Sequence, residues 1–195
     1  MGIAGFFNHP IMKKFVLIFG LMTVWLITGM AQSDGSVSFS FSNEDQRETV
    51  VYLVRHAEKG AAKGAMMSKD PGLTAQGKAR AKALARLLKD AGIDYVFSSD
   101  YKRTRNTAQP IAKLLGVEVE LYDPRNLDEL STIIKGKAGR YLVVGHSNTT
   151  PSMVELLGGQ PGTPIKESEY DRLYTVVLTD GAEPVTVLLR YGKAK

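Results

Sequence analysis

Two histidines and a neighbouring arginine stand directly after two apolar segments, where the ends of strands can carry reactive side chains. His56 follows the apolar segment 50–54 with Arg55 beside it, and His146 follows the apolar segment 141–145. An unprotonated imidazole nitrogen is a nucleophile, and arginine offers rigid, permanently charged donors for an anion. A lone histidine is usually satisfied by backbone hydrogen bonds, but two at equivalent strand ends favour a shared reactive site.

A third segment, Ser98 to Ala108, passes from an expected strand into an expected helix. Arg103 falls in the first turn of this helix, where unpaired backbone N–H groups and the positive end of the helix dipole favour anions. An isolated arginine at such a place is usually a solvated surface residue. Arg103 therefore becomes a candidate ligand for an anion only in combination with the two histidines.

The elements that must position these residues alternate between strand and helix patterns. Short apolar runs predict strands, and apolar residues at helical spacing predict helices after Thr74 and Asn126 as N-caps. The expected strands are 50–54, 95–98, 117–121 and 141–145. The expected helices are 75–91, 102–115 with a kink at Pro110, 126–135, and one that starts at 150–151. Residues 173–178 and 185–189 are expected to form a closing hairpin.

This alternation predicts an α/β fold, a three-layer sandwich with a mainly parallel central sheet and helices on both faces. In open sheets of this kind, ligands bind outside the carboxyl ends of the strands. His56 and His146 both stand at such ends. The loops 60–72 and 158–165 are expected to form the walls of an open pocket there.

The composition is that of a globular protein. The 195 residues are 44% hydrophobic and 23% charged, with a formal net charge of +5. The basic residues are scattered rather than gathered in a block, so nucleic acid is not an expected partner. The chain has no cysteine, which excludes thiol catalysis and cysteine-ligated metal sites.

Residues 1–31 have the pattern of an export signal. Lys13 and Lys14 precede an apolar run from Phe15 to Ile27, and small residues up to Ala31 suit a signal peptidase. The run is shorter than the roughly 20 residues that a bilayer span requires, which favours cleavage over a retained anchor and no stable membrane insertion afterwards. We expect a periplasmic or secreted bacterial protein.

Two further regions are expected after the signal. Residues 32–49 form a polar tether, in which 37–41 alternate as an edge strand would, and residues 50–195 form the folded domain.

Together and in this order, the motifs resemble those of the histidine phosphatase superfamily, the phosphoglycerate mutase-like enzymes. The segments that carry the resemblance are Arg55-His56-Ala57, Leu73 to Gly77, Ser98 to Ala108, and Gly145-His146. The resemblance covers most of the chain after the predicted signal. It implies that His56 is the nucleophile and that Arg55, Arg103 and His146 hold the phosphoryl group.

This chemistry sets opposite requirements for the two histidines. His56 must be neutral at one nitrogen to attack phosphorus, whereas a protonated His146 would add a donor to the phosphoryl oxygens. A covalent phosphohistidine divides the displacement into two steps, with water attacking in the second. Because the positive charge comes from arginine and histidine, no metal and no cofactor is expected.

A general acid/base is harder to locate. The resemblance implies a carboxylate after the third strand or directly after the second histidine, where this chain has Ser147. Asp123, at a strand end, is the first choice, whereas Asp128 and Glu129 on the next helix fit a solvated face or helix N-terminal charges.

The two charged residues that follow His56 and Ala57 have two alternative interpretations. Glu58 and Lys59 either contact substrate or form a surface ion pair.

The sequence therefore predicts an exported, metal-independent phosphatase of the histidine acid type. It would act on phosphomonoesters of small molecules, or on a phosphoprotein. Phosphoglycerate mutase is less favoured, because export separates it from glycolytic substrates and the chain lacks room for longer insertions. Protein phosphohistidine phosphatase and a catalytically silent anion-binding module remain as alternatives.

Overall fold

The structure is a computed structural model that describes residues 48–60 and 70–192. The predicted signal 1–31 and the candidate strand 37–41 lie outside the described residues. All of the described residues belong to the second of two compact units, Asn43–Lys195. No helix among them is long and apolar enough to cross a bilayer.

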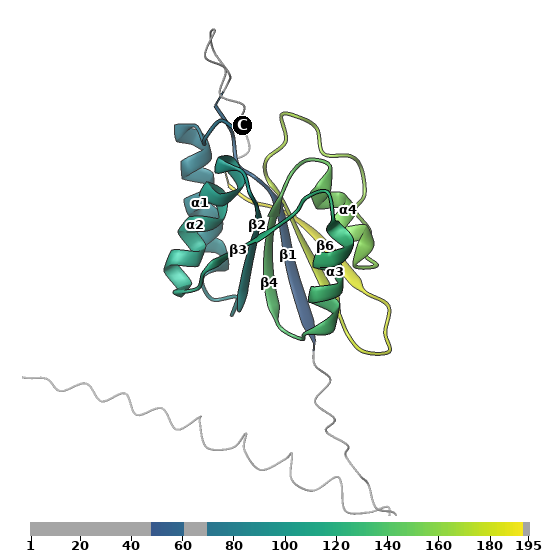
Figure 1. Cartoon of the computed structure of the whole chain (residues 1–195). Coiled ribbons are helices and arrows are strands. Elements are labelled where there is room, and N and C mark those ends of the chain that lie inside the picture. The colour runs from purple at the N-terminus through teal and green to yellow at the C-terminus, as the bar shows by residue number, and fades with distance from the viewer. Residues whose placement is uncertain (1–47, 61–69, 193–195) are drawn as a thin grey trace, which may run out of the picture. The chain divides into compact units, whose positions relative to one another are not determined.

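Six strands form one sheet in the order β3-β2-β4-β1-β5-β6 (Figure 1). The strands are β1 (Thr49–Arg55), β2 (Tyr95–Ser99), β3 (Val119–Tyr122), β4 (Arg140–Gly145), β5 (Arg172–Leu178) and β6 (Val185–Arg190). The first four are mutually parallel, and β5 and β6 add an antiparallel hairpin beside β1. The mainly parallel sheet and the closing hairpin are both confirmed.

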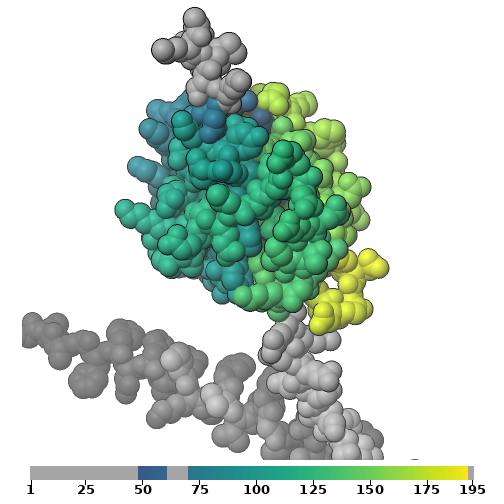
Figure 2. All heavy atoms as spheres, in the orientation of Figure 1, coloured from purple at the N-terminus to yellow at the C-terminus, as the bar shows by residue number. Residues whose placement is uncertain are grey.

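Helices cover both faces of the sheet, so the three-layer prediction is confirmed. The helices are α1 (Ala75–Leu88), α2 (Lys102–Leu115), α3 (Leu127–Gly136) and α4 (Thr149–Leu156). In the space-filling view, side chains in the blue-to-green colours of these segments cover the face turned to the viewer (Figure 2).

The core divides into two main clusters because successive strand side chains point to opposite faces. Val54 of β1 packs with Leu84 of α1 on one face of the sheet. Leu53, one residue earlier, packs with Leu130 of α3 and Met153 of α4 on the other. This double burial explains why the strands that end at the histidines are almost uninterrupted apolar runs.

Several element boundaries differ from the sequence predictions. Thr49 was assigned to the tether but is the first residue of β1. Helix α1 ends at Leu88 rather than at 91, since the chain turns there with a hydrogen bond from Ala91 N to Leu88 O. Strand β3 starts at 119 rather than 117, because Val117 N bonds back to Ala112 O and so completes the end of α2.

The two predicted N-caps differ in what their side chains do. The Thr74 hydroxyl accepts a hydrogen bond from Gly77 N at 3.0 Å, so this cap is confirmed. Asn126 occupies the N-cap position of α3, but its side chain makes no cap bond and donates to Glu129 instead.

Candidate active site

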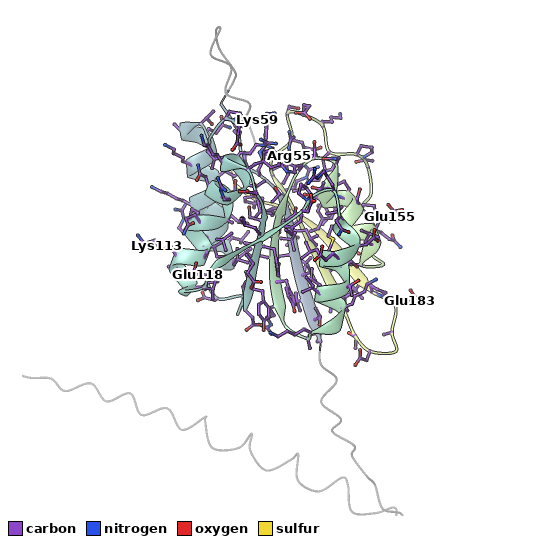
Figure 3. All side chains as sticks on the ribbon, in the orientation of Figure 1. Arg55, Lys59, Lys113, Glu118, Glu155 and Glu183 are labelled. Atoms are coloured by element: carbon purple, nitrogen blue, oxygen red, sulfur yellow. The ribbon has the colours of Figure 1, made fainter. Side chains whose placement is uncertain are left out.

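The pairing of β1 with β4 brings the two histidines together at the carboxyl end of the sheet. Arg55 lies opposite Gly145 in the parallel register, and His56 N donates to Gly145 O at 2.9 Å. The imidazole rings of His56 and His146 meet edge to face, with their centroids 5.6 Å apart. Arg55 marks this end of the sheet in Figure 3.

His56 is buried and is held in one tautomer. Its Nδ1 lies 2.8 Å from Ala57 O, so the neutral ring donates its Nδ1–H there and keeps a bare lone pair on Nε2. Burial lowers the pKa of His56 to about 3, and the charges of Arg55 and Arg103 oppose protonation further. At neutral pH the side chain is therefore unprotonated at Nε2, as a nucleophile must be.

His146 is oriented from behind by a serine. Its Nε2 lies 2.9 Å from Ser99 Oγ, and its Nδ1 lies 3.5 Å from a terminal nitrogen of Arg103. Because a guanidinium only donates, Nδ1 is the acceptor and Nε2–H points to the serine. Ser99 in turn contacts Thr104 in the first turn of α2, which links His146 to the helix that carries Arg103.

The protonated His146 expected from the sequence is not the state of the unliganded protein. Burial, followed by the charges of Arg103, Arg55 and Lys59, lowers the pKa of His146 to about 4. Both imidazoles are therefore neutral at pH 7. A dianion placed between them would favour a proton on His146, since an opposite charge raises the pKa of a histidine.

Arg103 faces His146 from the start of α2. Its guanidinium stacks on the Tyr101 ring, 4.3 Å from the ring centroid, and lies 3.5 Å from Asp70, which also accepts from Lys102 N. The Nε of Arg103 is buried without a hydrogen-bond partner among the described residues. Asp70 could not be identified from the sequence, because no local pattern indicates its contact with Lys102 and Arg103.

Arg55 is anchored by the loop that precedes β5. One terminal nitrogen, Nη1, donates to the backbone oxygens of Lys166, Glu167 and Glu169, and the other, Nη2, contacts the Glu167 carboxylate. The guanidinium also stacks on Tyr170, 4.2 Å from the ring centroid. The sequence predicts a pocket wall only at 158–165, where glycines indicate a loop, and it gives no signal for the continuation that contacts Arg55.

The three acid candidates are not brought into contact with the histidines in the described part of the chain. Asp123 is exposed and ion-paired with Arg125, whose hydrogen bonds lower its pKa. Glu129 accepts from Asn126, and the backbone oxygen of Asp128 accepts from the Thr132 hydroxyl.

Asp123 and Glu129 line a separate cavity of about 100 Å³ beside β3. A carboxylate with a lowered pKa is a weak proton donor at neutral pH, so the choice of Asp123 stays a prediction with less physical support.

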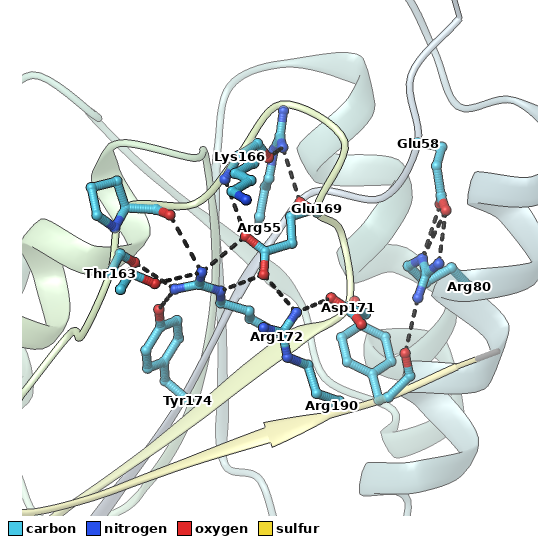
Figure 4. A network of polar contacts seen from close by, with 12 residues as sticks. Arg55, Glu58, Arg80, Thr163, Lys166, Glu169, Asp171, Arg172, Tyr174 and Arg190 are labelled. Atoms are coloured by element: carbon cyan, nitrogen blue, oxygen red, sulfur yellow. Dashed lines mark hydrogen bonds and ion pairs between the residues drawn. The ribbon is translucent and has the colours of Figure 1, made fainter. Parts of the chain in front are cut away.

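Glu58 belongs to a partly buried ion pair. Its carboxylate takes hydrogen bonds of 2.9–3.0 Å from Arg80 of α1, with side-chain exposures of 13% and 9%. Arg80 also donates to Tyr191 O after β6 (Figure 4). Glu58 therefore does form an ion pair, but with Arg80 rather than Lys59, and the pair is partly buried. It fixes the segment after His56 to α1 and to the end of the sheet.

A larger cavity, of about 450 Å³, lies between α2 and β3 and contains none of the predicted site residues. Among residues 48–60 and 70–192, no group of three or more His, Cys, Asp or Glu side chains is arranged to hold a metal ion.

Comparison with known proteins adds a family and a fold. The model of the histidine phosphatase superfamily (branch 1) matches residues 51–132. A probable phosphoglycerate mutase GpmB of Serratia proteamaculans is 46% identical over 77 residues, which are 38% of this chain and 35% of that protein. The corresponding protein of Escherichia fergusonii is 43% identical over the same length. The match thus spans about a third of these curated relatives.

Two solved structures share the fold over nearly their whole length. The protein histidine phosphatase SixA complexed with tungstate is 19% identical, with a TM-score of 0.58, and the alignment covers 73% of this chain and 97% of that one. A putative phosphohistidine phosphatase SixA from Agrobacterium tumefaciens is 23% identical, with a TM-score of 0.56 and coverage of 75% and 98%.

Proposed function

We propose that this chain, whose residues 51–132 match the model of the histidine phosphatase superfamily, is a phosphatase that hydrolyses phosphomonoesters through a phosphohistidine on His56. The observation that carries the proposal is the state of His56. The imidazole is buried, and its hydrogen bond to Ala57 O leaves Nε2 unprotonated. The positive charges of Arg55 and Arg103 disfavour protonation of the ring, so Nε2 is available to attack phosphorus. An inert core histidine can share this neutral state, so the proposal also depends on Arg55, Arg103 and His146, which lie around the ring as a phosphoryl site requires.

The proposed reaction has two displacements at phosphorus. His56 Nε2 forms a bond to phosphorus as the ester P–O bond breaks, and the departing oxygen takes its proton from a general acid or from water. Water then attacks phosphorus, the P–N bond breaks, and His56 returns to its neutral form. Arg55 and Arg103 stabilise the negative charge on the transferred oxygens in both steps.

His146 would supply the third group around the phosphoryl oxygens. Its Nε2 is bound to Ser99, so Nδ1, on the side of Arg103, is the position where a proton would be added when the dianion binds. The protonated ring would then donate to a phosphoryl oxygen. Release of phosphate would return His146 to its neutral form.

Protein phosphohistidine phosphatase is the second candidate. It is favoured by the extent of the structural match, since the chain covers 97–98% of the two SixA chains but only 35% of the GpmB proteins. The longest described segment between elements is residues 157–171, which leaves the site without a large cap in this part of the chain. Parallel assays on a phosphohistidine peptide and on phosphorylated metabolites would separate the candidates.

The enzyme proposal is tested by hydrolysis of an aryl phosphate. We expect turnover by the wild type, its loss in His56→Ala, and normal rates in Lys113→Ala, which changes an exposed residue of α2. Hydrolysis should also survive exhaustive chelation, because the proposed charge stabilisation uses arginine and histidine. Tight phosphate binding without any turnover would instead support a silent anion-binding module.

We further propose export, with residues 1–31 as a cleaved signal. Cleavage after Ala31 would remove Trp25, the only tryptophan of the chain. The exported protein should therefore show tyrosine-only fluorescence and an N-terminus at Gln32. An N-terminal sequence that starts at Met1 or Met12 would contradict the proposal.

A further inference from the structure

The three guanidinium nitrogens of Arg55 differ in how many hydrogen-bond acceptors they already have. The side chain is 2% exposed, and its Nη1 is saturated by three backbone oxygens at 2.9–3.1 Å. Its Nε is buried without a partner in the described part of the chain. Only Nη2 and Nε therefore remain for an incoming anion.

One of these two positions already faces a carboxylate. Glu167 Oε2 lies 3.0 Å from Arg55 Nη2, and Glu167 Oε1 lies 3.4 Å from Ser147 Oγ, next to His146. The Glu167 side chain is 78% exposed, whereas Arg55 is buried. The charge of Arg55 lowers the pKa of Glu167, which is therefore an anion at neutral pH.

The backbone around Glu167 is fixed independently of its carboxylate. Its own carbonyl oxygen is held by Arg55, and Glu169 pairs with Arg172 and Arg190 (Figure 4). Arg172 also donates to Thr163 at the start of this loop. The exposed Glu167 side chain can consequently leave Arg55 without unfolding the loop.

We propose that Glu167 is a built-in competitor for the phosphoryl subsite and thereby sets its affinity. A phosphoryl group that takes the Nε and Nη2 edge of Arg55 must displace the carboxylate or share one guanidinium with it. Both cases place two anions side by side, which weakens binding. The inference rests on the proposed function only in assigning Arg55 to the phosphoryl group.

The rival interpretation is that Glu167 only orients Arg55. The two interpretations predict opposite signs when the charge of Glu167 is removed. Loss of a competitor strengthens anion binding, helped by the remaining positive charges of Arg55 and Lys59, whereas loss of an orienting contact weakens it. Glu167→Gln keeps the size of the side chain and an oxygen acceptor for Arg55, so it isolates the charge.

The test measures the dissociation constant of inorganic phosphate by calorimetry at pH 8 and fixed ionic strength. We expect Glu167→Gln to bind phosphate about 2- to 5-fold more tightly than the wild type, the range typical of one exposed charge pair. The matched control is Glu183→Gln, which makes the same change in net charge in the β5–β6 turn, at the opposite end of the sheet (Figure 3). This variant should leave the constant unchanged.

Equal or weaker binding by Glu167→Gln would overturn the inference, as would an equal gain in Glu183→Gln, since that would be a long-range charge effect. No measurable binding to any variant would also count against it. Because the measurement needs no turnover, it separates the two proposals. Tighter phosphate binding with no hydrolysis of any ester would refute the enzyme but support the competitor.

Discussion

Gly145, the last residue of β4, is expected to tolerate no side chain. A Cβ at this position would lie 2.8 Å from Thr149 Oγ1, 2.9 Å from the Tyr122 hydroxyl and 3.2 Å from Thr150 Oγ1. Two of these distances are below any normal contact with a carbon atom. The Thr149 hydroxyl is also the acceptor for His146 N, at 2.9 Å, so a clash here displaces the histidine directly.

The cost of Gly145→Ala follows from these contacts. Forcing one methyl group into a closely packed site costs about 1–3 kcal/mol, and a lost hydrogen bond adds about 0.5–1.5 kcal/mol. We therefore expect the free energy of unfolding to fall by about 2–4 kcal/mol. The catalytic rate should fall as well, because the His146 backbone moves.

Urea denaturation of Gly145→Ala and Gly136→Ala is the appropriate assay. Gly136 is the last residue of α3, and a Cβ there would meet no heavy atom within 4 Å. Gly136→Ala should be neutral or gain up to about 1 kcal/mol from helix propensity. Equal unfolding midpoints for the two variants, with unchanged hydrolysis, would refute the packing argument.

Three further predictions concern the titratable groups. His56 has a pKa of about 3 in the fold and near 6.5 when unfolded, so its contribution to stability is complete above pH 6.5 and is lost as the pH falls toward 3. Urea denaturation at pH 5 should show about 2 kcal/mol less stability from this group than at pH 7, and His56→Gln should lose that part of the pH dependence. Binding of tungstate, a dianion, at pH 7 should take up about one proton through His146, seen as buffer-dependent calorimetric heats that His146→Gln abolishes. Asp123→Asn should slow alkyl phosphates by roughly 10²-fold or more and aryl phosphates far less if it is the general acid; a selective loss in Asp128→Asn or Glu129→Gln would move the role to the helix.

The sequence was informative where function depends on position along a strand. An uninterrupted apolar run predicts a strand that is buried on both faces. If two such strands are parallel neighbours, the histidines that follow them must lie close together. That is how His56 and His146 come together across β1 and β4. The arginine at the start of α2 could be placed for the same reason, since it also follows a strand end.

Features that depend on the path of a loop could not be predicted. Asp70 beside Arg103 and Glu167 beside Arg55 are ordinary acidic residues in irregular segments, distant in sequence from their partners. The protonation state of His146 also could not be predicted from the sequence. The neutral state of His146 comes from burial and from two guanidinium groups, which only the assembled site combines.

The central claim is that His56 Nε2 carries the phosphoryl group during turnover. Its most direct test is phosphorus NMR, supported by peptide mapping, on enzyme trapped with substrate by a base quench that preserves phosphohistidine. Because Nδ1 is bound to Ala57 O, we expect phosphate on His56 at Nε2 in the wild type. We expect none in Arg103→Ala trapped at the same time point, because the loss of Arg103 slows its formation. Phosphate on Nδ1, on another residue, or on no residue while hydrolysis proceeds would contradict it.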